Sequence, residues 1–235
     1  MRLDHYLVAK NLVESRTKAQ SLIKEGYVRV DAKVVRKASF RIGSEEVCID
    51  DIRVYVSRSA QKLKHFLPQL PFNVTGMCAL DIGASTGGFS EVLLEYGAAH
   101  VDAVDVGHDQ LHPRLRDDAR VHSFEGTDIR QFTCKTPYDL VVSDVSFISL
   151  LLLLEAIDRL SKEWIVLLFK PQFEVGREVK RDRNGVIHDA KAVAKAMQRF
   201  EDACSLQGWT LIAKEAASIT GKEGNREYCY GYKRG

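Results

Sequence analysis

The chain has 235 residues, of which 45% are hydrophobic and 28% charged, a composition typical of a soluble globular protein. No apolar run approaches the roughly 20 residues that a membrane-spanning helix needs, and the N-terminus lacks the apolar core of an export signal. We therefore expect a cytoplasmic protein that does not insert into membranes. The five cysteines are scattered without a Cys-x-x-Cys pair, so neither a disulfide framework nor a cysteine zinc site is expected.

The net charge of +2 is unevenly distributed, because residues 1–58 carry 12 Lys and Arg against 8 Asp and Glu. A basic segment on a slightly acidic body predicts a module that binds a polyanion such as RNA, with an ordinary solvated surface as the alternative. The candidate RNA-binding residues are Arg2, Arg16, Lys18, Lys24, Arg29 and Lys33.

Residues 1–56 have the pattern of a small α+β domain. Apolar residues from Leu3 to Leu12 predict one helix, and Ser15 is a suitable N-cap for a second helix that ends at Gly26. Short strands are expected to follow, at 27–30, 34–35, 46–49 and 52–56. Residues 57–76 are interpreted as a linker with a bridging helix from about Ser59 to Pro68.

From residue 77 to 235 the chain alternates strands and helices, which predicts a mostly parallel sheet covered on both faces. Seven strands are expected: 77–82, 100–105, 120–123, 139–143, 164–169, 211–217 and 227–232. The expected helices are 88–96, 109–116, 150–160 and 189–207, with a turn at 128–131. The last two strands lack a helix between them, so they are predicted to form an antiparallel hairpin. The polar stretch 173–188 is interpreted as a long loop near the active edge.

A glycine-rich turn follows the first of these strands. Glycine permits positive φ and close approach of a ligand to the backbone, and an acidic residue before the first glycine suits a ligand with an ammonium group. S-adenosylmethionine is such a ligand, whereas a plain strand–helix turn is the alternative. The candidate cofactor-binding residues of this turn are Asp81, Gly83, Ala84, Ser85, Thr86, Gly87, Gly88 and Phe89.

Acidic residues also follow later strands, at the edge where doubly wound sheets bind ligands. Asp105 could accept hydrogen bonds from ribose hydroxyls, Asp128 could accept one from an adenine amino group, and Asp144 ends the fourth strand. Helix capping is the alternative for Asp105 and Asp128.

Two lysines and two acids are expected at this same edge. Asp144 and Lys170 follow strands, Glu227 begins the last strand, and Lys62 comes from the bridging helix. Methylation of a 2′-hydroxyl needs such a set, because a lysine can act as the base only if its pKa falls from about 10.4 towards neutrality. No metal is required, and His108 and His112 are expected to be solvated.

The N-terminal segment resembles the RNA-binding fold first named for the fourth ribosomal small-subunit protein. The likeness rests on Arg2-Leu3-Asp4, Ser15-Arg16, Ala19, the run from Ile23 through Gly26 to Val30, and Lys33. The usual Asn-Gly or Asp-Gly turn is Asp31-Ala32 here.

The whole chain resembles the TlyA family, which joins that fold to an FtsJ-like ribose methyltransferase domain. Its motifs correspond to 81–89, 144–150, 170–176 and 224–228, although Ser59 and Ala60 replace two glycines usual in the family. The resemblance implies a Rossmann-like class I methyltransferase with a catalytic tetrad of Lys62, Asp144, Lys170 and Glu227. It also implies S-adenosylmethionine-dependent 2′-O-methylation of cytidine in ribosomal RNA or ribosomal subunits.

Three other functions stay open from the sequence. The family also carries a haemolysin label, which suggests a membrane-active protein, and a non-catalytic ribosome-assembly factor could retain the cofactor fold. A base methyltransferase is disfavoured, because Asp144-Val145-Ser146-Phe147 replaces the Asn/Asp-Pro-Pro-Tyr/Phe motif common in amino-group methylation. The modified nucleotide, the number of RNA substrates and the oligomeric state are not predictable.

Overall fold

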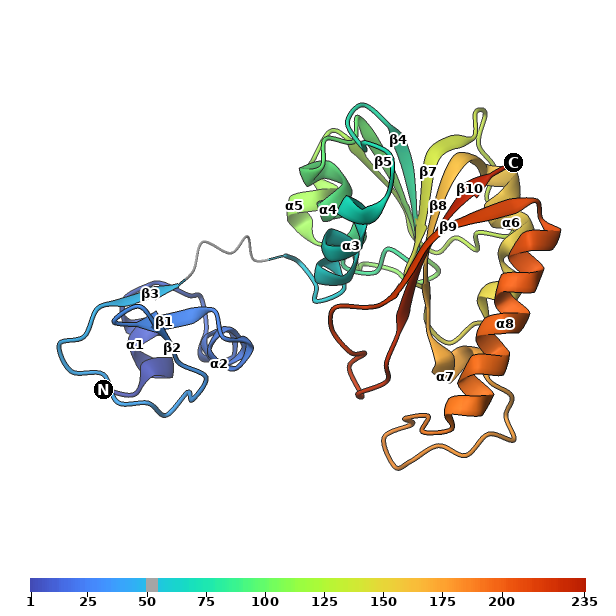
Figure 1. Ribbon diagram of the computed structural model, residues 1–235. Helices are drawn as coiled ribbons and strands as arrows, with labels where there is room; N and C mark the ends of the chain where they lie inside the picture. The colour runs from blue at the N-terminus through green and yellow to red at the C-terminus, as the bar shows by residue number, and fades with distance from the viewer. Residues whose placement is uncertain (50–54) are drawn as a thin grey trace. The chain divides into compact units, whose positions relative to one another are not determined.

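A computed structural model describes residues 1–49 and 55–235, apart from the side chain of Glu25. The chain forms two compact units, Met1–Val54 and Tyr55–Gly235, and each is described by itself (Figure 1). Across the described residues, we find no helix that is both long and apolar enough to cross a membrane.

The first unit packs two helices on a small antiparallel sheet. Its elements are α1 (Leu3–Ala9), α2 (Arg16–Glu25), β1 (Val28–Val30), β2 (Lys33–Val34) and β3 (Val47–Ile49), with strand order β2-β1-β3. The predicted ends of α2 are confirmed: the Ser15 hydroxyl accepts a hydrogen bond from the Lys18 amide, and Gly26 is left-handed with φ of 90°. Leu3, Leu7 and Ile23 are fully buried in its core.

The turn between β1 and β2 explains how the chain replaces the usual Asn-Gly. Asp31 and Ala32 have φ of 48° and 63°, the left-handed pair that a two-residue hairpin turn requires. Alanine pays a steric cost in this region that glycine does not. The strand predicted at 52–56 falls mostly on residues 50–54, outside the described residues, and Tyr55 and Val56 are not in a strand.

The second unit has a seven-stranded sheet with strand order β6-β5-β4-β7-β8-β10-β9. The first five strands in this order are parallel, and β10 runs antiparallel to both of its neighbours. The predicted class I methyltransferase fold is confirmed. The strands are β4 (Cys78–Ile82), β5 (His100–Val104), β6 (Val121–Phe124), β7 (Tyr138–Ser143), β8 (Ser161–Phe169), β9 (Trp209–Ala216) and β10 (Tyr228–Arg234).

Helices cover both faces of this sheet (Figure 1). They are α3 (Ala60–Phe66), α4 (Gly88–Glu95), α5 (Pro113–Arg116), α6 (Leu154–Leu160), α7 (Pro171–Glu174) and α8 (Ala190–Leu206), with 3-10 turns at Leu67–Gln69 and Leu150–Leu152. Phe66 and Leu93 belong to the apolar core on one face, and Ile157 and Phe200 to the core on the other. Central parallel strands are accordingly apolar on both sides.

Two helix predictions were wrong in their extent. The helix expected at 109–116 begins only at Pro113, because Asp109 has a positive φ of 54° and the Glu125 carboxylate accepts the amides of Asp109, Gln110 and Leu111. The helix expected at 150–160 is divided into a 3-10 turn and α6. The short helix α7 was not predicted.

Candidate active site

Asp81 lies at the carboxyl end of β4 and is completely buried. Its Oδ2 accepts hydrogen bonds from the Ser90 amide (2.9 Å) and hydroxyl (2.7 Å), whereas its Oδ1 has no partner among the described residues. Burial raises the pKa of this carboxyl to about 7, and the Ser90 hydrogen bonds oppose part of that rise. A cation placed at Oδ1 would favour the ionised form.

The turn after Asp81 needs its glycines for conformation and packing. Gly83 and Gly87 have φ of 78° and 94°. A Cβ at Gly88 would lie 2.1 Å from the Ser57 hydroxyl oxygen, so α4 begins in close contact with the segment that leads into α3. The turn and the segment that leads into α3 therefore lie side by side and line the same cavity.

Asp105 and Asp128 border a cavity of about 600 Å³ together with Gly83, Ser85 and Asp144. Each oxygen of Asp105 accepts a backbone amide, Oδ2 from Ser85 (2.8 Å) and Oδ1 from Gly107 (2.7 Å). Asp128 accepts the Arg130 amide and forms an ion pair with its guanidinium at 2.5 Å, which lowers the pKa of Asp128. Asp128 thus caps the turn that follows it.

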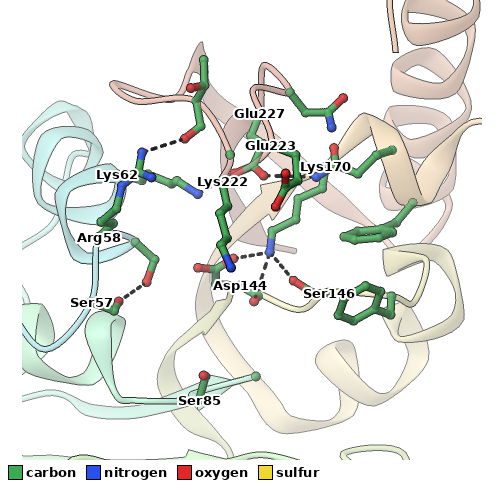
Figure 2. A pocket seen from close by; sticks show the side chains of 18 of the residues that line it. Ser57, Arg58, Lys62, Ser85, Asp144, Ser146, Lys170, Lys222, Glu223 and Glu227 are labelled. Atoms are coloured by element: carbon green, nitrogen blue, oxygen red, sulfur yellow. Dashed lines mark hydrogen bonds and ion pairs between the residues drawn. The ribbon is translucent and has the colours of Figure 1, made fainter. Parts of the chain in front are cut away.

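The two lysines and two acids line one cavity of about 860 Å³, which Asp81, residues 83–86 of the glycine-rich turn and Phe89 also line. Lys170 Nζ lies 2.7 Å from Asp144 Oδ1 and 2.8 Å from the Ser146 hydroxyl (Figure 2). Lys62 Nζ lies 2.5 Å from Glu227 Oε2. Lys62, Lys170 and Glu227 are buried, with Lys170 only 8% exposed.

The topology explains why these four side chains meet. Asp144 and Lys170 directly follow the parallel strands β7 and β8, so both lie at the carboxyl edge of the sheet. Because β10 is antiparallel to β8 and Tyr228 pairs with Phe169, Glu227 enters at that same edge. Lys62 reaches it from the first turn of α3.

Several residues of this cavity were not identified from the sequence. The Gln172 amide nitrogen donates to Glu227 Oε1 at 3.2 Å, and Ser146 contacts Lys170 as described above. Phe147 borders both cavities with 91% of its surface exposed and a positive φ of 67°. Arg181 and Gly185, from the predicted long loop, also line the larger cavity.

The candidate RNA-binding residues of the first unit differ in their contacts. Arg2 and Arg16 form ion pairs with the fully buried Asp4, at 2.9 and 3.0 Å, and the Arg2 hydrogen bond lowers the pKa of that carboxyl. Arg29 lies on β1, and its guanidinium donates a hydrogen bond to the Ala32 carbonyl. Lys18 and Lys24 lie on α2 and Lys33 on β2.

Comparison with known proteins places both units in described families. Residues 55–234 match the FtsJ-like methyltransferase family, and residues 1–48 match the S4 domain. The 23S rRNA (cytidine-2′-O)-methyltransferase TlyA of Campylobacter jejuni is 43% identical, over 99% of both chains. The 16S/23S rRNA (cytidine-2′-O)-methyltransferase TlyA of Mycobacterium tuberculosis is 40% identical, over 97% of this chain and 87% of the relative.

A solved structure is also similar along the whole chain. It is a hemolysin candidate from Streptococcus thermophilus, 32% identical, with a TM-score of 0.74 over 100% of this chain and 88% of the other. The two family matches give the order of the domains, and the identity to the two TlyA relatives extends over both domains. The chain therefore belongs to the TlyA family, in which an S4 domain precedes an FtsJ-like methyltransferase domain.

Proposed function

We propose that this protein methylates the 2′-hydroxyl of cytidine in ribosomal RNA, with S-adenosylmethionine as the methyl donor. The observation that supports this most is the ion pair between the buried Lys170 and Asp144, which lines the same cavity as Asp81 and its unpartnered Oδ1. Membership in the FtsJ-like family and the named activity of the two TlyA relatives support the reaction and the substrate.

The residues present fit S-adenosylmethionine. The unpartnered Oδ1 of Asp81 suits the ammonium of its methionine part, and Asp105 retains acceptor capacity for ribose hydroxyls beyond its two backbone amides. The two cavities share Gly83, Ser85 and Asp144, as an elongated ligand with an amino-acid end and a nucleoside end requires. When bound, this cofactor supplies a methyl group on a positively charged sulfur.

Lys170 is proposed as the base. A neutral amine at Nζ can accept the proton of a ribose 2′-hydroxyl, which makes that oxygen nucleophilic. Asp144 and Ser146 fix the position of Nζ, and the Asp144 carboxylate would stabilise the ammonium that forms when the proton arrives. Orientation of this kind supplies much of the rate in reactions without a covalent enzyme intermediate.

Lys62 and Glu227 are proposed to hold the ribose beside Lys170. Glu227 is held from two sides, by the Lys62 amine and the Gln172 amide, so its carboxylate has a fixed direction. The S4 domain is proposed to bind structured ribosomal RNA in the cytoplasm, either as free RNA or as part of a ribosomal subunit.

Mapping of 2′-O-methyl groups in ribosomal RNA tests the proposal. RNA from wild-type cells is compared with RNA from cells that lack the gene and from cells complemented with the Lys170→Ala variant. We expect at least one cytidine methylation in the wild type that is absent from the other two. Identical methylation patterns in all three would overturn the proposed function.

A further inference from the structure

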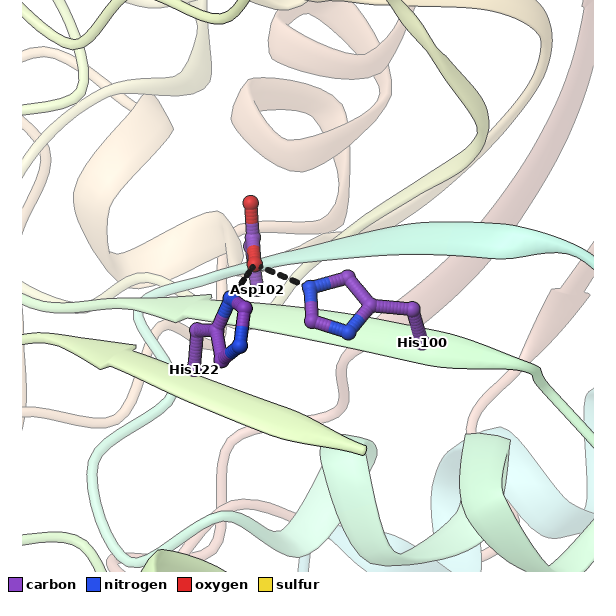
Figure 3. A group of neighbouring side chains, drawn as sticks. All are labelled: His100, Asp102 and His122. Carbon is purple, nitrogen blue, oxygen red and sulfur yellow. Dashed lines mark hydrogen bonds and ion pairs between the residues drawn. The ribbon is translucent and has the colours of Figure 1, made fainter. Parts of the chain in front are cut away.

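A cluster of metal-ligating side chains lies on one face of the paired strands β5 and β6 (Figure 3). His100 and Asp102 are two residues apart on β5, so they point to the same face, and His122 is the direct partner of Asp102 on β6. None of the three lines either cavity of the candidate active site. His100 and Asp102 instead border a separate hollow of about 480 Å³.

We propose that His100, Asp102 and His122 form a zinc site, with water in the fourth position. The ligand atoms are His100 Nε2, Asp102 Oδ1 and His122 Nδ1. Two imidazoles, a carboxylate and an open position form a donor set that Zn²⁺ commonly takes in proteins.

The distances are close to those of a tetrahedral site. Asp102 Oδ1 lies 2.5 Å from His100 Nε2 and 3.5 Å from His122 Nδ1, and all three ligand atoms lie within 4.8 Å of one another. Zinc–ligand bonds of about 2.1 Å place neighbouring ligand atoms roughly 3.4 Å apart. The His100–Asp102 hydrogen bond would open by less than about 1 Å to admit the ion. Rotation of an exposed imidazole suffices for the rest, since the His122 side chain is 63% exposed.

A second observation is that the Asp102 carboxylate is already held in position on the side away from the histidines. The Tyr138 hydroxyl donates a hydrogen bond to Asp102 Oδ2, the oxygen that does not face the histidines. Tyr138 is itself buried in the core, so its ring holds the hydroxyl at this oxygen. Hydrogen bonds to the outer side of a metal ligand orient it and strengthen metal binding.

The consequence would be structural. β6 is the last strand at one edge of the sheet and has only four residues. A metal held by both strands would tie this edge to β5. The site is independent of the proposed methyl transfer, because its residues contact neither active-site cavity.

Titration of the reduced, chelator-treated full-length protein with zinc chloride tests the proposal. Calorimetry is expected to show one Zn²⁺ bound per chain, with affinity reduced at least about tenfold in His122→Ala. Zinc is expected to raise the unfolding temperature of the wild type more than that of His122→Ala, because stabilisation grows with the affinity of the folded state for the ligand. Without zinc, the two proteins should unfold at the same temperature and transfer methyl groups equally.

Two control variants separate this site from other zinc ligands. His65 is an exposed histidine whose Nε2 lies 4.0 Å from Glu215 Oε1, outside the proposed site, so His65→Ala should bind zinc like the wild type. Cys78 borders the same hollow, and Cys78→Ala should also retain binding. Equal zinc affinity in the wild type and His122→Ala, or loss of binding only in Cys78→Ala, would overturn the proposal and indicate a hydrogen-bonded network without metal.

Discussion

The buried carboxyl of Asp81 links folding to protonation. Its pKa is about 7 in the folded chain, against about 3.9 in an unfolded one. Between these values the folded state binds more protons than the unfolded state, so Asp81 makes the free energy of unfolding fall as the pH rises. The chain retains an unfavourable buried charge above pH 7, which a cationic ligand at Oδ1 would compensate.

Asp81→Asn should remove this dependence. The free energy of unfolding of the variant should equal that of the wild type at pH 4. Above pH 8 it should exceed that of the wild type by at most about 4 kcal/mol. Urea unfolding at several pH values measures it. Asp118→Asn is the control, since Arg120 lowers the pKa of Asp118 and no change between pH 5 and 8 is expected there. Parallel pH profiles for Asp81→Asn and the wild type would contradict this account of the burial.

At the residue scale, position along the strands was enough to propose the site. Asp81 lies near the carboxyl end of a strand, Asp144 and Lys170 each follow one, and the carboxyl ends of parallel strands share one edge. The contacts that fix these side chains were not predictable. Ser146 at Lys170 and Gln172 at Glu227 depend on how β7, β8 and β10 are placed in three dimensions. The roles of the four tetrad residues stay predictions.

Individual elements of the first unit are joined by a buried acid. Asp4, on α1, accepts hydrogen bonds from Arg2 and from Arg16 and Gln20, the last two on α2. These contacts lower the pKa of Asp4, so its contribution to stability is present at neutral pH and is lost as the pH falls below about 4. Arg2 and Arg16 therefore have a structural contact in addition to any contact with RNA.

Asp4→Ala should loosen the contact between α1 and α2. We expect the free energy of opening of this unit to fall by about 1–3 kcal/mol, because three donor side chains lose a charged acceptor. Hydrogen exchange of the α1 and α2 amides in the full-length protein measures it. Glu14→Ala makes the same change of charge at an exposed position and should have little effect. Equal exchange in both variants would show that the buried acid contributes nothing.

Regular elements followed from the sequence, and irregular ones did not. The apolar strands and the long helix α8 have the expected period and caps, and Asp189 accepts the amides of Lys191 and Ala192. The helix predicted at 109–116 begins later than expected, because the amides of its first three residues donate hydrogen bonds to the Glu125 carboxylate, which is distant in the sequence. The His100, Asp102 and His122 cluster was missed for the same reason, since a partner strand supplies the third side chain.

The molecule as a whole separates the candidate chemistry from the S4 domain. Among the described residues, all those that line the two active-site cavities come from the unit Tyr55–Gly235. Tyr55 and Val56 belong with that unit, since the Tyr55 hydroxyl accepts a hydrogen bond from the Lys64 amine and the Val56 amide donates one to the Glu91 carboxylate. The two-domain composition was expected from the charge distribution and the resemblance.

Removal of residues 1–54 should therefore separate two activities. Affinity for S-adenosylmethionine is expected to change less than about twofold, because its candidate site is intact. Affinity for ribosomal RNA should fall, and its dependence on salt should weaken, because fewer phosphates are neutralised. Calorimetry and filter binding at several salt concentrations measure the two. Unchanged RNA affinity of the truncated protein would contradict the role proposed for the S4 domain.

The most direct test of the central claim compares methyl transfer and cofactor binding in Lys170→Ala. Lys162→Ala is the control, because Lys162 lies on β8 as an exposed lysine paired with Asp139. Transfer of a labelled methyl group to ribosomal RNA should fall by at least about 10²-fold in Lys170→Ala, while its affinity for S-adenosylmethionine is retained and Lys162→Ala behaves as the wild type. Wild-type rates in Lys170→Ala, or an equal loss of transfer and cofactor binding, would contradict the assignment of Lys170 as the base.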